Sequence, residues 1–195
     1  MSSTASSEVH KRWLSHRQAV VYSFARWAAA SAARQGCPVR GRKLYRYLDD
    51  VPLHEILLDA NPISAEEFAA WHRRAVEALA IQPPYSPIGI GWAAKLVNLL
   101  LKVTAYIDSE GRVGLRNYLH PPIDNQLIHA IRQKYSLQGS ERDANELLRK
   151  KVDRFTAIIG IDSYDTYLEI VEGLQEVARR EGCLELCEVE SLWPG

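Results

Sequence analysis

Two residues in the middle of the chain, Lys95 and Asp124, have the types and surroundings that nucleophilic amine chemistry requires. Lys95 stands within an apolar run, and Asp124 follows two prolines at the point where a new helix is expected to begin. A neutral lysine amine is a nucleophile, and a carboxylate stabilises a positive charge that develops beside it. The pair therefore predicts lysine-based chemistry, provided that the fold brings the two side chains together.

Lys95 is expected in the first turn of a helix that begins near Trp92. The positive end of the helix dipole disfavours an ammonium there, so lysine is a poor choice for stability alone. Partial burial beside Trp92 and Leu96 would favour the neutral amine. The alternative is that Lys95, Asn98 and Lys102 form the polar stripe of a buried helix, and that Lys95 simply reaches solvent along its alkyl stem.

Asp124 has the expected position of a helix N-cap. Pro121 and Pro122 push the residues before them into extended geometry, so a helix begins only after them. Aspartate is favoured at an N-cap without any catalytic purpose, which is the alternative interpretation of this residue. The same backbone amides and helix dipole also suit a group that acts as an anion beside a developing cation.

Gly89 and Gly91 flank Ile90 in a predicted turn directly before the apolar helix. Glycine permits a positive φ and a close approach of the backbone to a ligand. Exposed amides at this turn therefore predict a place where a phosphate is held. The sequence contains no phosphate-binding loop of the G-x-x-x-x-G-K-[ST] type and no nucleophile elbow.

Together these pieces resemble the helix–hairpin–helix DNA glycosylase superfamily. Its members carry a G-x-G hairpin, a lysine at the start of the next helix and a P-x-D segment that opens a later helix. The matching residues are Gly89, Ile90 and Gly91, then Lys95, and then Pro122, Ile123 and Asp124. The resemblance implies an all-helical, two-lobed fold that holds double-stranded DNA between its lobes. It also implies that Lys95 attacks C1′ of a flipped nucleotide to form a Schiff base, while Asp124 stabilises charge on the sugar.

The resemblance also assigns contacts with DNA, because amides of the hairpin would grip a backbone phosphate. The candidate DNA-binding residues are Gly89, Ile90, Gly91, Trp92 and Lys102. In the family the lysine follows the second glycine by two residues, a position that Ala93 holds in this chain. The loop between lysine and aspartate is long and looks closer to the archaeal 8-oxoguanine branch. The alternative function is a non-catalytic helical module that binds DNA or another protein.

The spacing of apolar residues predicts an all-α protein, since no strand pattern accompanies the helical one. We expect one helical domain with two lobes, about 1–86 with the C-terminal helices and about 87–160 with the hairpin and core helices. The expected helices are a first one that ends near Gly36 to Pro38, one capped by Ser64 and Glu67, the central one, and then 124–135, 140–155, 163–181 and 184–192.

Composition is that of an ordinary soluble domain, with 47% hydrophobic and 25% charged residues among 195. The formal net charge of zero hides an asymmetry. Between residues 9 and 48 there are nine Lys or Arg residues and no acid, whereas the segment from residue 160 onward has nine acids. One end of the protein is therefore suited to phosphates, and the other is expected to be solvated or packed against the basic end.

No metal, cofactor or membrane is expected. The histidines are scattered, and three cysteines match neither a disulfide framework nor a zinc site. The apolar run from Ile88 to Ile107 carries three polar residues at helical spacing and is expected to be a buried helix. The first residues do not form a secretory signal, so a cytoplasmic location is the default. The expected partner is double-stranded DNA, and no protein partner is identified.

Overall fold

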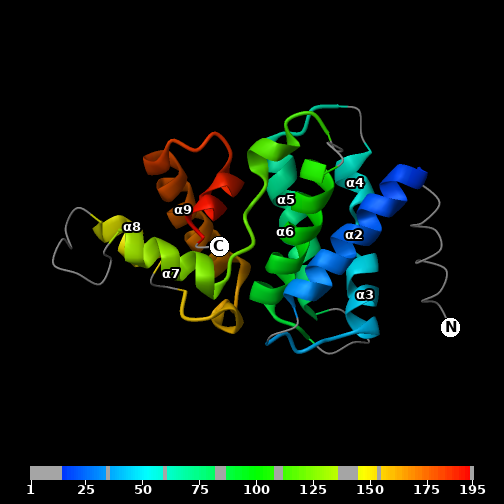
Figure 1. Ribbon diagram of the computed structural model, residues 1–195, viewed down its shortest axis with the longest axis horizontal. Helices are drawn as coiled ribbons and strands as arrows, with labels where there is room; N and C mark the ends of the chain where they lie inside the picture. Colours follow the sequence, from blue (N-terminus) through cyan, green and yellow to red (C-terminus); the bar gives the residue numbers. More distant parts are fainter. Residues whose placement is uncertain are drawn as a thin grey trace.

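The computed structural model describes residues 15–33, 36–58, 61–81, 87–107, 112–135, 145–152 and 155–193. Within these ranges the chain forms helices and connections without a strand, which confirms the predicted all-α class (Figure 1). The longer helices are α2 (His16–Ala32), α3 (Arg42–Asp49), α5 (Ala65–Ile81), α6 (Ile90–Ile107), α7 (Asn125–Lys134), α8 (Glu146–Val152) and α9 (Tyr164–Glu181). The shorter elements are α4 (His54–Leu57) and the 3₁₀ turns η1 (Leu115–Tyr118), η2 (Ile158–Gly160) and η3 (Leu186–Leu192).

Side-chain caps explain where α5 and α9 begin. The Glu67 amide donates to the Ser64 hydroxyl, which is one half of the predicted capping box. The Glu67 carboxylate also binds the Arg112 guanidinium, which ties the start of α5 to the segment after α6. Ser163 caps α9 by accepting from a backbone amide, and Gly182 ends that helix in the left-handed conformation. These caps give α9 the bounds that the sequence predicts.

Helix α6 begins earlier than the sequence predicts, and this changes the setting of Lys95. The Ala93 amide donates to the Gly89 carbonyl over 3.0 Å, so the helix starts at Ile90 rather than near Trp92. Gly89 precedes it with a φ of 79°. Gly91 consequently lies inside the first helical turn, and Lys95 lies in the second turn. The helix dipole acts mainly within the first turn and therefore contributes less at Lys95 than expected.

Other predicted bounds shift by a few residues. Helix α2 ends at Ala32 rather than near Gly36, and residues 1–14, which include the first residues of the predicted helix, lie outside the described ranges. Of the helix predicted over 140–155, α8 covers Glu146–Val152, and residues 140–144 and 153–154 also lie outside those ranges. The last predicted helix is present as the 3₁₀ turn η3.

The helices form two groups, joined by an extended segment at residues 119–124 that we call the linking segment (Figure 1). In the first lobe, α2 to η1, helix α6 packs against α2 and α5. In the second lobe, α7 to η3, helix α9 packs against α8 and η3. The expected boundary near residue 86 separates α6 from α2 and α5. The observed grouping keeps the three together, because α6 buries apolar side chains against both neighbours.

Helix α6 is the buried helix that the sequence predicts. Its buried residues include Leu96, Val97, Leu100 and Leu101. By length and composition alone α6 would also pass as a membrane span, but most of it is buried inside the protein. The core helix of a globular protein meets the same two criteria.

The second lobe touches the start of α6 through a glycine. A Cβ atom added to Gly91 would lie 2.0 Å from the carbonyl oxygen of Ile158 in η2. That oxygen belongs to the backbone, which cannot rotate away as a flexible side chain does. Gly91 thus permits η2 and α6 to approach each other closely, and this close packing accounts for a glycine within the first turn of a helix.

We expect Gly91→Ala to destabilise the protein by about 3 kcal/mol or more, because the backbone of η2 must move to admit the methyl group. Gly89→Ala is the matched control, since its added Cβ would meet no atom within 4 Å and only the positive φ is strained. That strain corresponds to about 1–2 kcal/mol. Urea unfolding of both variants measures the difference, and equal destabilisation would contradict the close approach at Gly91.

Candidate functional site

The polar stripe of α6, which consists of Lys95, Asn98 and Lys102, faces the second lobe and the linking segment rather than open solvent. Lys95 Nζ lies 3.1 Å from Asp124 Oδ2. Asn98 is 1% exposed and bonds to groups from both. Lys102 Nζ lies 2.5 Å from Glu190 Oε2 in η3. The structure therefore gives every member of the stripe a partner across the junction of the two lobes.

Lys95 and Asp124 are brought together across 29 positions of sequence, as the predicted chemistry requires. The two side chains are 11% and 16% exposed, so they are largely but not completely removed from solvent. The Lys95 ammonium also lies 5.6 Å from the centre of the Trp92 ring, in a cation–π arrangement. The alternative that Lys95 points freely into solvent does not describe this geometry.

Asp124 is the N-cap of α7, as the sequence predicts. Its Oδ1 atom accepts hydrogen bonds from the amides of Gln126 and Leu127, both over 3.0 Å. This leaves Oδ2 directed at Lys95. Asn98 holds the preceding residues in place, because its Nδ2 donates to the Pro121 carbonyl over 3.1 Å. Two features thus fix the position of the carboxylate. The cap of α7 holds Asp124 itself, and Asn98 of α6 holds the residues before it.

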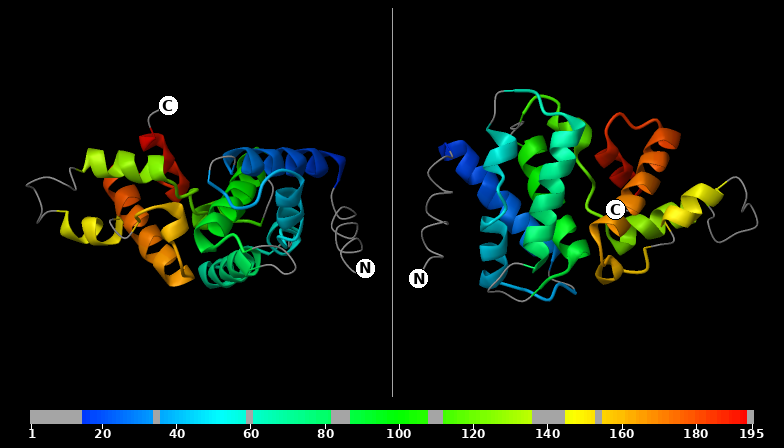
Figure 2. Two further views of the ribbon diagram at one scale, coloured as in Figure 1. Left: turned by 90° about the horizontal axis from the view of Figure 1, so that it is seen from below. Right: turned by 180° about the vertical axis from the view of Figure 1, so that it is seen from behind.

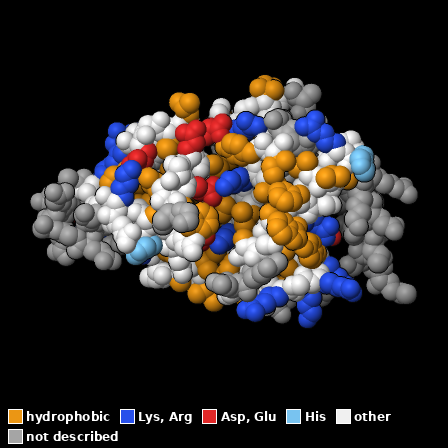
Figure 3. Space-filling model, viewed as in Figure 1, with side chains coloured by type: hydrophobic (Ala, Val, Ile, Leu, Met, Phe, Trp, Pro, Cys, Tyr) orange, Lys and Arg blue, Asp and Glu red, His pale blue; other side chains and the backbone are white. Residues whose placement is uncertain are grey.

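Lys95 and Asp124 line a cleft of about 480 Å³ between the lobes. Ser31 at the end of α2, Trp92 on α6 and Trp193 beyond η3 also line it. On the face of the molecule that Figure 3 shows, basic and acidic side chains lie next to each other in the middle, and apolar side chains flank them. The volume lies within the range typical of small-molecule sites, about 300–1,000 Å³.

The five residues predicted to bind DNA do not all lie at this cleft. Gly89 is exposed at the start of α6, and Ile90 beside it is half-buried. Gly91 is buried against η2. Trp92 is 4% exposed and lines the cleft, and its indole nitrogen has no partner among the described residues. Lys102 lies about two turns beyond Lys95 along α6, and its ammonium is engaged by Glu190.

A buried hydrogen-bond network beneath the cleft was not predicted from the sequence. His72 Nδ1 lies 2.6 Å from the Tyr164 hydroxyl, and His72 Nε2 lies 2.8 Å from Asn98 Oδ1. Asn98 Nδ2 also donates to the Tyr167 hydroxyl over 3.0 Å, and this hydroxyl lies 2.8 Å from His120 Nδ1. The network joins α5, α6, α9 and the linking segment. The sequence did contain a signal for this network, because polar side chains stand at positions that have the spacing of a buried helix face.

Both histidines of the network are neutral near pH 7. Burial lowers the pKa of His72 to about 4, although the Asn98 hydrogen bond opposes that shift. Burial also lowers the pKa of His120 well below its usual value, and the neighbouring His72 acts in the same direction. The two rings lie 4.9 Å apart, so charge on either one would disfavour charge on the other.

Comparisons with protein-family models, with curated proteins and with solved structures return no match to this chain. Within the described ranges, no three His, Cys, Asp or Glu side chains gather in a way that suits a metal ion. The three cysteines, which all lie in those ranges, are free thiols.

The buried His72 predicts a loss of stability in mild acid. A histidine whose pKa is lower in the folded state takes up its proton first in the unfolded chain. Acid therefore favours unfolding from the ordinary pKa of 6.5 down to about 4. We expect His72 alone to lower the free energy of unfolding by about 2 kcal/mol between pH 7 and pH 5. Urea unfolding at the two pH values measures this change.

His129→Gln is the control for this prediction, because His129 is exposed on α7. We expect that variant to keep the full pH dependence, whereas His72→Gln has a smaller one in addition to a lower stability at both pH values. An unchanged pH dependence in His72→Gln would show that His72 does not carry the effect.

Proposed function

We propose that this protein is a DNA-lesion glycosylase and abasic-site lyase that acts through a Schiff base at Lys95. The observation that supports the proposal is the Lys95–Asp124 pair, with 3.1 Å between nitrogen and oxygen, at the wall of a cleft between two helical lobes. A lysine that borders a cleft and touches a carboxylate can pass a proton to that carboxylate, which then acts as a general base and leaves the amine free to attack. The resemblance drawn from the sequence supplies the substrate class.

The proposed reaction needs no reactant other than the protein, the DNA and solvent. The Lys95 ammonium gives a proton, through Asp124 or solvent, to the departing base, and its nitrogen then forms a bond to C1′ as the C1′–base bond breaks. A proton next moves from that nitrogen to O4′ as the C1′–O4′ bond opens, which leaves the Schiff base. Asp124 stabilises the positive charge that develops on the sugar, since its Oδ2 already faces the lysine.

Aromatic side chains near the cleft are suited to an unstacked nucleotide. Phe24 and Trp27 are 45% and 52% exposed on α2 and stack on each other with ring centres 5.6 Å apart. Ser31, one turn beyond Trp27, lines the cleft. Exposed aromatic faces stack on bases, with about 1–3 kcal/mol per base. The face of α2 thus leads from the surface toward Lys95.

Positive charge for the DNA backbone is available near the start of α3. Arg40, Arg42 and Lys43 are exposed, and no described residue forms an ion pair with them. Lys and Arg side chains gather at the lower edge of the molecule in Figure 3, below the start of α3 in Figure 1. Acidic side chains from the C-terminal part of the chain form ion pairs with basic residues outside this region, for example Asp165 with Arg73. The basic region therefore stays open to phosphates.

The same surface favours a second candidate function, a non-catalytic helical module that binds DNA. The exposed Phe24–Trp27 stack and the basic start of α3 suffice for such binding without any reaction at Lys95. The two functions differ only in what Lys95 does, so covalent trapping distinguishes them.

We expect borohydride to trap a covalent adduct between the protein and a DNA duplex that carries an abasic site or 8-oxoguanine. Lys95→Arg should abolish the adduct, because arginine keeps the positive charge beside Asp124 but forms no Schiff base. Lys134→Ala is the control, since Lys134 also pairs with a carboxylate, Glu181, but stands on α7 outside the cleft lining. That variant should be trapped as well as the unaltered protein.

Two results would count against the enzyme. An adduct that persists in Lys95→Arg would show that another amine reacts, and no adduct with either substrate would exclude the lyase. In the second case, salt-dependent binding of undamaged duplex would support the non-catalytic DNA-binding module, and its absence would remove DNA as the partner.

A further inference from the structure

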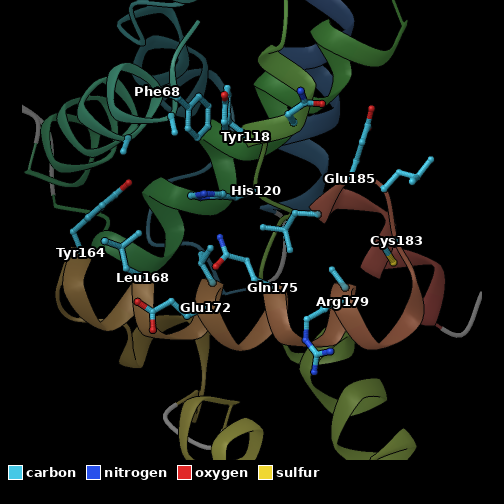
Figure 4. A pocket seen from close by; sticks show the side chains of 17 residues that line it. Phe68, Tyr118, His120, Tyr164, Leu168, Glu172, Gln175, Arg179, Cys183 and Glu185 are labelled. Atoms are coloured by element: carbon cyan, nitrogen blue, oxygen red, sulfur yellow. The ribbon is translucent and has the colours of Figure 1, made fainter.

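A second pocket, of about 610 Å³, lies between α5 and α9. Seen from below, α2 and α7 lie on one side of the molecule, and α5 and much of α9 lie on the other (Figure 2). The pocket and the Lys95 cleft thus lie on opposite sides of the lobe junction, and they share no lining residue. Phe68, Tyr118, His120, Leu168 and Gln175 are among the residues that surround the pocket (Figure 4).

His120 brings an unused hydrogen-bonding atom to this pocket. The side chain lines the pocket although the residue is only 9% exposed. Its Nδ1 atom is engaged by the Tyr167 hydroxyl. No described residue forms a hydrogen bond with its Nε2 atom. This atom is also not fully buried, so it keeps contact with open space. Nε2 therefore opens toward the pocket.

Asn98 fixes the direction of the hydrogen bonds that lead to His120. The Pro121 carbonyl can only accept, so the atom of Asn98 that contacts it must be the amide nitrogen. The same nitrogen donates to the Tyr167 hydroxyl. Asn98 Oδ1 is then an acceptor, and His72 must donate to it from Nε2. His72 Nδ1 consequently accepts from the Tyr164 hydroxyl.

The same reasoning sets the proton on His120. The Tyr167 hydroxyl accepts from Asn98, and its own proton is left to donate to His120 Nδ1. Burial raises the pKa of Tyr167 well above its usual value, so this proton stays in place. His120 is neutral because burial lowers its pKa, and with Nδ1 accepting it carries its one proton on Nε2. The pocket therefore contains a fixed N–H donor.

The walls around this donor are aromatic. The Phe68 ring meets the His120 ring edge to face, with centres 5.5 Å apart, and it stacks on Tyr118 at 6.1 Å. Leu168 and Val171 of α9 add aliphatic surface on the other side. The amides of Asn117 and Gln175 also line the pocket. Largely apolar walls with a few placed polar groups are typical of sites for small molecules.

Charge at the rim disfavours an anionic ligand. Glu172 is neutralised by Lys151, and Arg179 is neutralised by Glu176. Glu185 accepts a hydrogen bond from the uncharged Tyr106 hydroxyl, so its negative charge is not balanced by that contact. The lining thus carries a net negative charge, which opposes the binding of a second anion.

We propose that the pocket binds a small, neutral, planar aromatic carbonyl compound, whose oxygen accepts from His120 Nε2 and whose ring packs against Phe68. Such a ligand satisfies the buried His120 donor and covers the aromatic wall without adding negative charge. The site is separate from the proposed Schiff-base chemistry, and neither depends on the other.

Benzamide is a suitable probe, and NMR titration of the ¹⁵N-labelled protein is the measurement. In the free protein, long-range ¹H–¹⁵N spectra should show His120 protonated on Nε2. Added benzamide should shift that resonance together with those of Leu168. Toluene lacks the carbonyl and leaves the buried donor unpaired, and benzoate is an anion that the acidic rim repels. Each should therefore bind at least about ten-fold more weakly than benzamide.

Two variants complete the test. His120→Phe should weaken benzamide binding about ten-fold. Leu168→Trp should fill the pocket and abolish binding while His120 keeps its Nε2 proton, so that a loss of binding is not confused with a loss of fold. Lys95→Arg should leave binding unchanged. A His120 proton on Nδ1, toluene binding equal to that of benzamide, or full binding by Leu168→Trp would each overturn the proposal.

Discussion

Three polar side chains on a mostly apolar helix determine how the two lobes fit together. Lys95, Asn98 and Lys102 lie on one stripe of α6, and a buried amide without a partner costs about 2–7 kcal/mol. The second lobe and the linking segment supply the missing partners, which include Asp124 and Glu190. Apolar burial is non-directional, whereas each of these bonds holds only in one arrangement. The polar stripe therefore sets the orientation of the lobes, and the apolar core supplies most of the driving force.

Asn98 has the central position in this arrangement because it acts on both faces of the junction. Its bond to the Pro121 carbonyl holds the linking segment three residues before Asp124, which places the carboxylate beside Lys95. Its bond to the Tyr167 hydroxyl sets the direction of the hydrogen bonds that end at His120. One side chain thus connects the geometry of the cleft with the protonation of the opposite pocket. Fully satisfied buried networks of this kind make one arrangement unique.

Local features of the sequence predicted local structure well. They did not identify contacts between residues that lie far apart in the sequence. The caps at Ser163 and Asp124 place the starts of α9 and α7, because each cap involves only neighbouring residues. The start of α6 was placed too late, since Gly89 was assigned to a hairpin turn although its carbonyl accepts the first bond of the helix. The approach of Lys95 to Asp124 was a condition of the predicted chemistry and not a result of any pattern. The buried network was missed because its members come from four separate segments.

The Lys95–Asp124 pair is difficult to explain by stability alone. Taking two charges out of water offsets much of their attraction, so apolar residues of similar size often stabilise a buried position equally well or better. The pair is also not needed to hold the linking segment, since Asn98 already binds the Pro121 carbonyl and Asp124 already caps α7. What distinguishes it from the Lys102–Glu190 pair on the same stripe is that both of its residues line the cleft. In addition to its part in the polar stripe, the Lys95–Asp124 pair borders the cleft, and the proposed chemistry rests on that position.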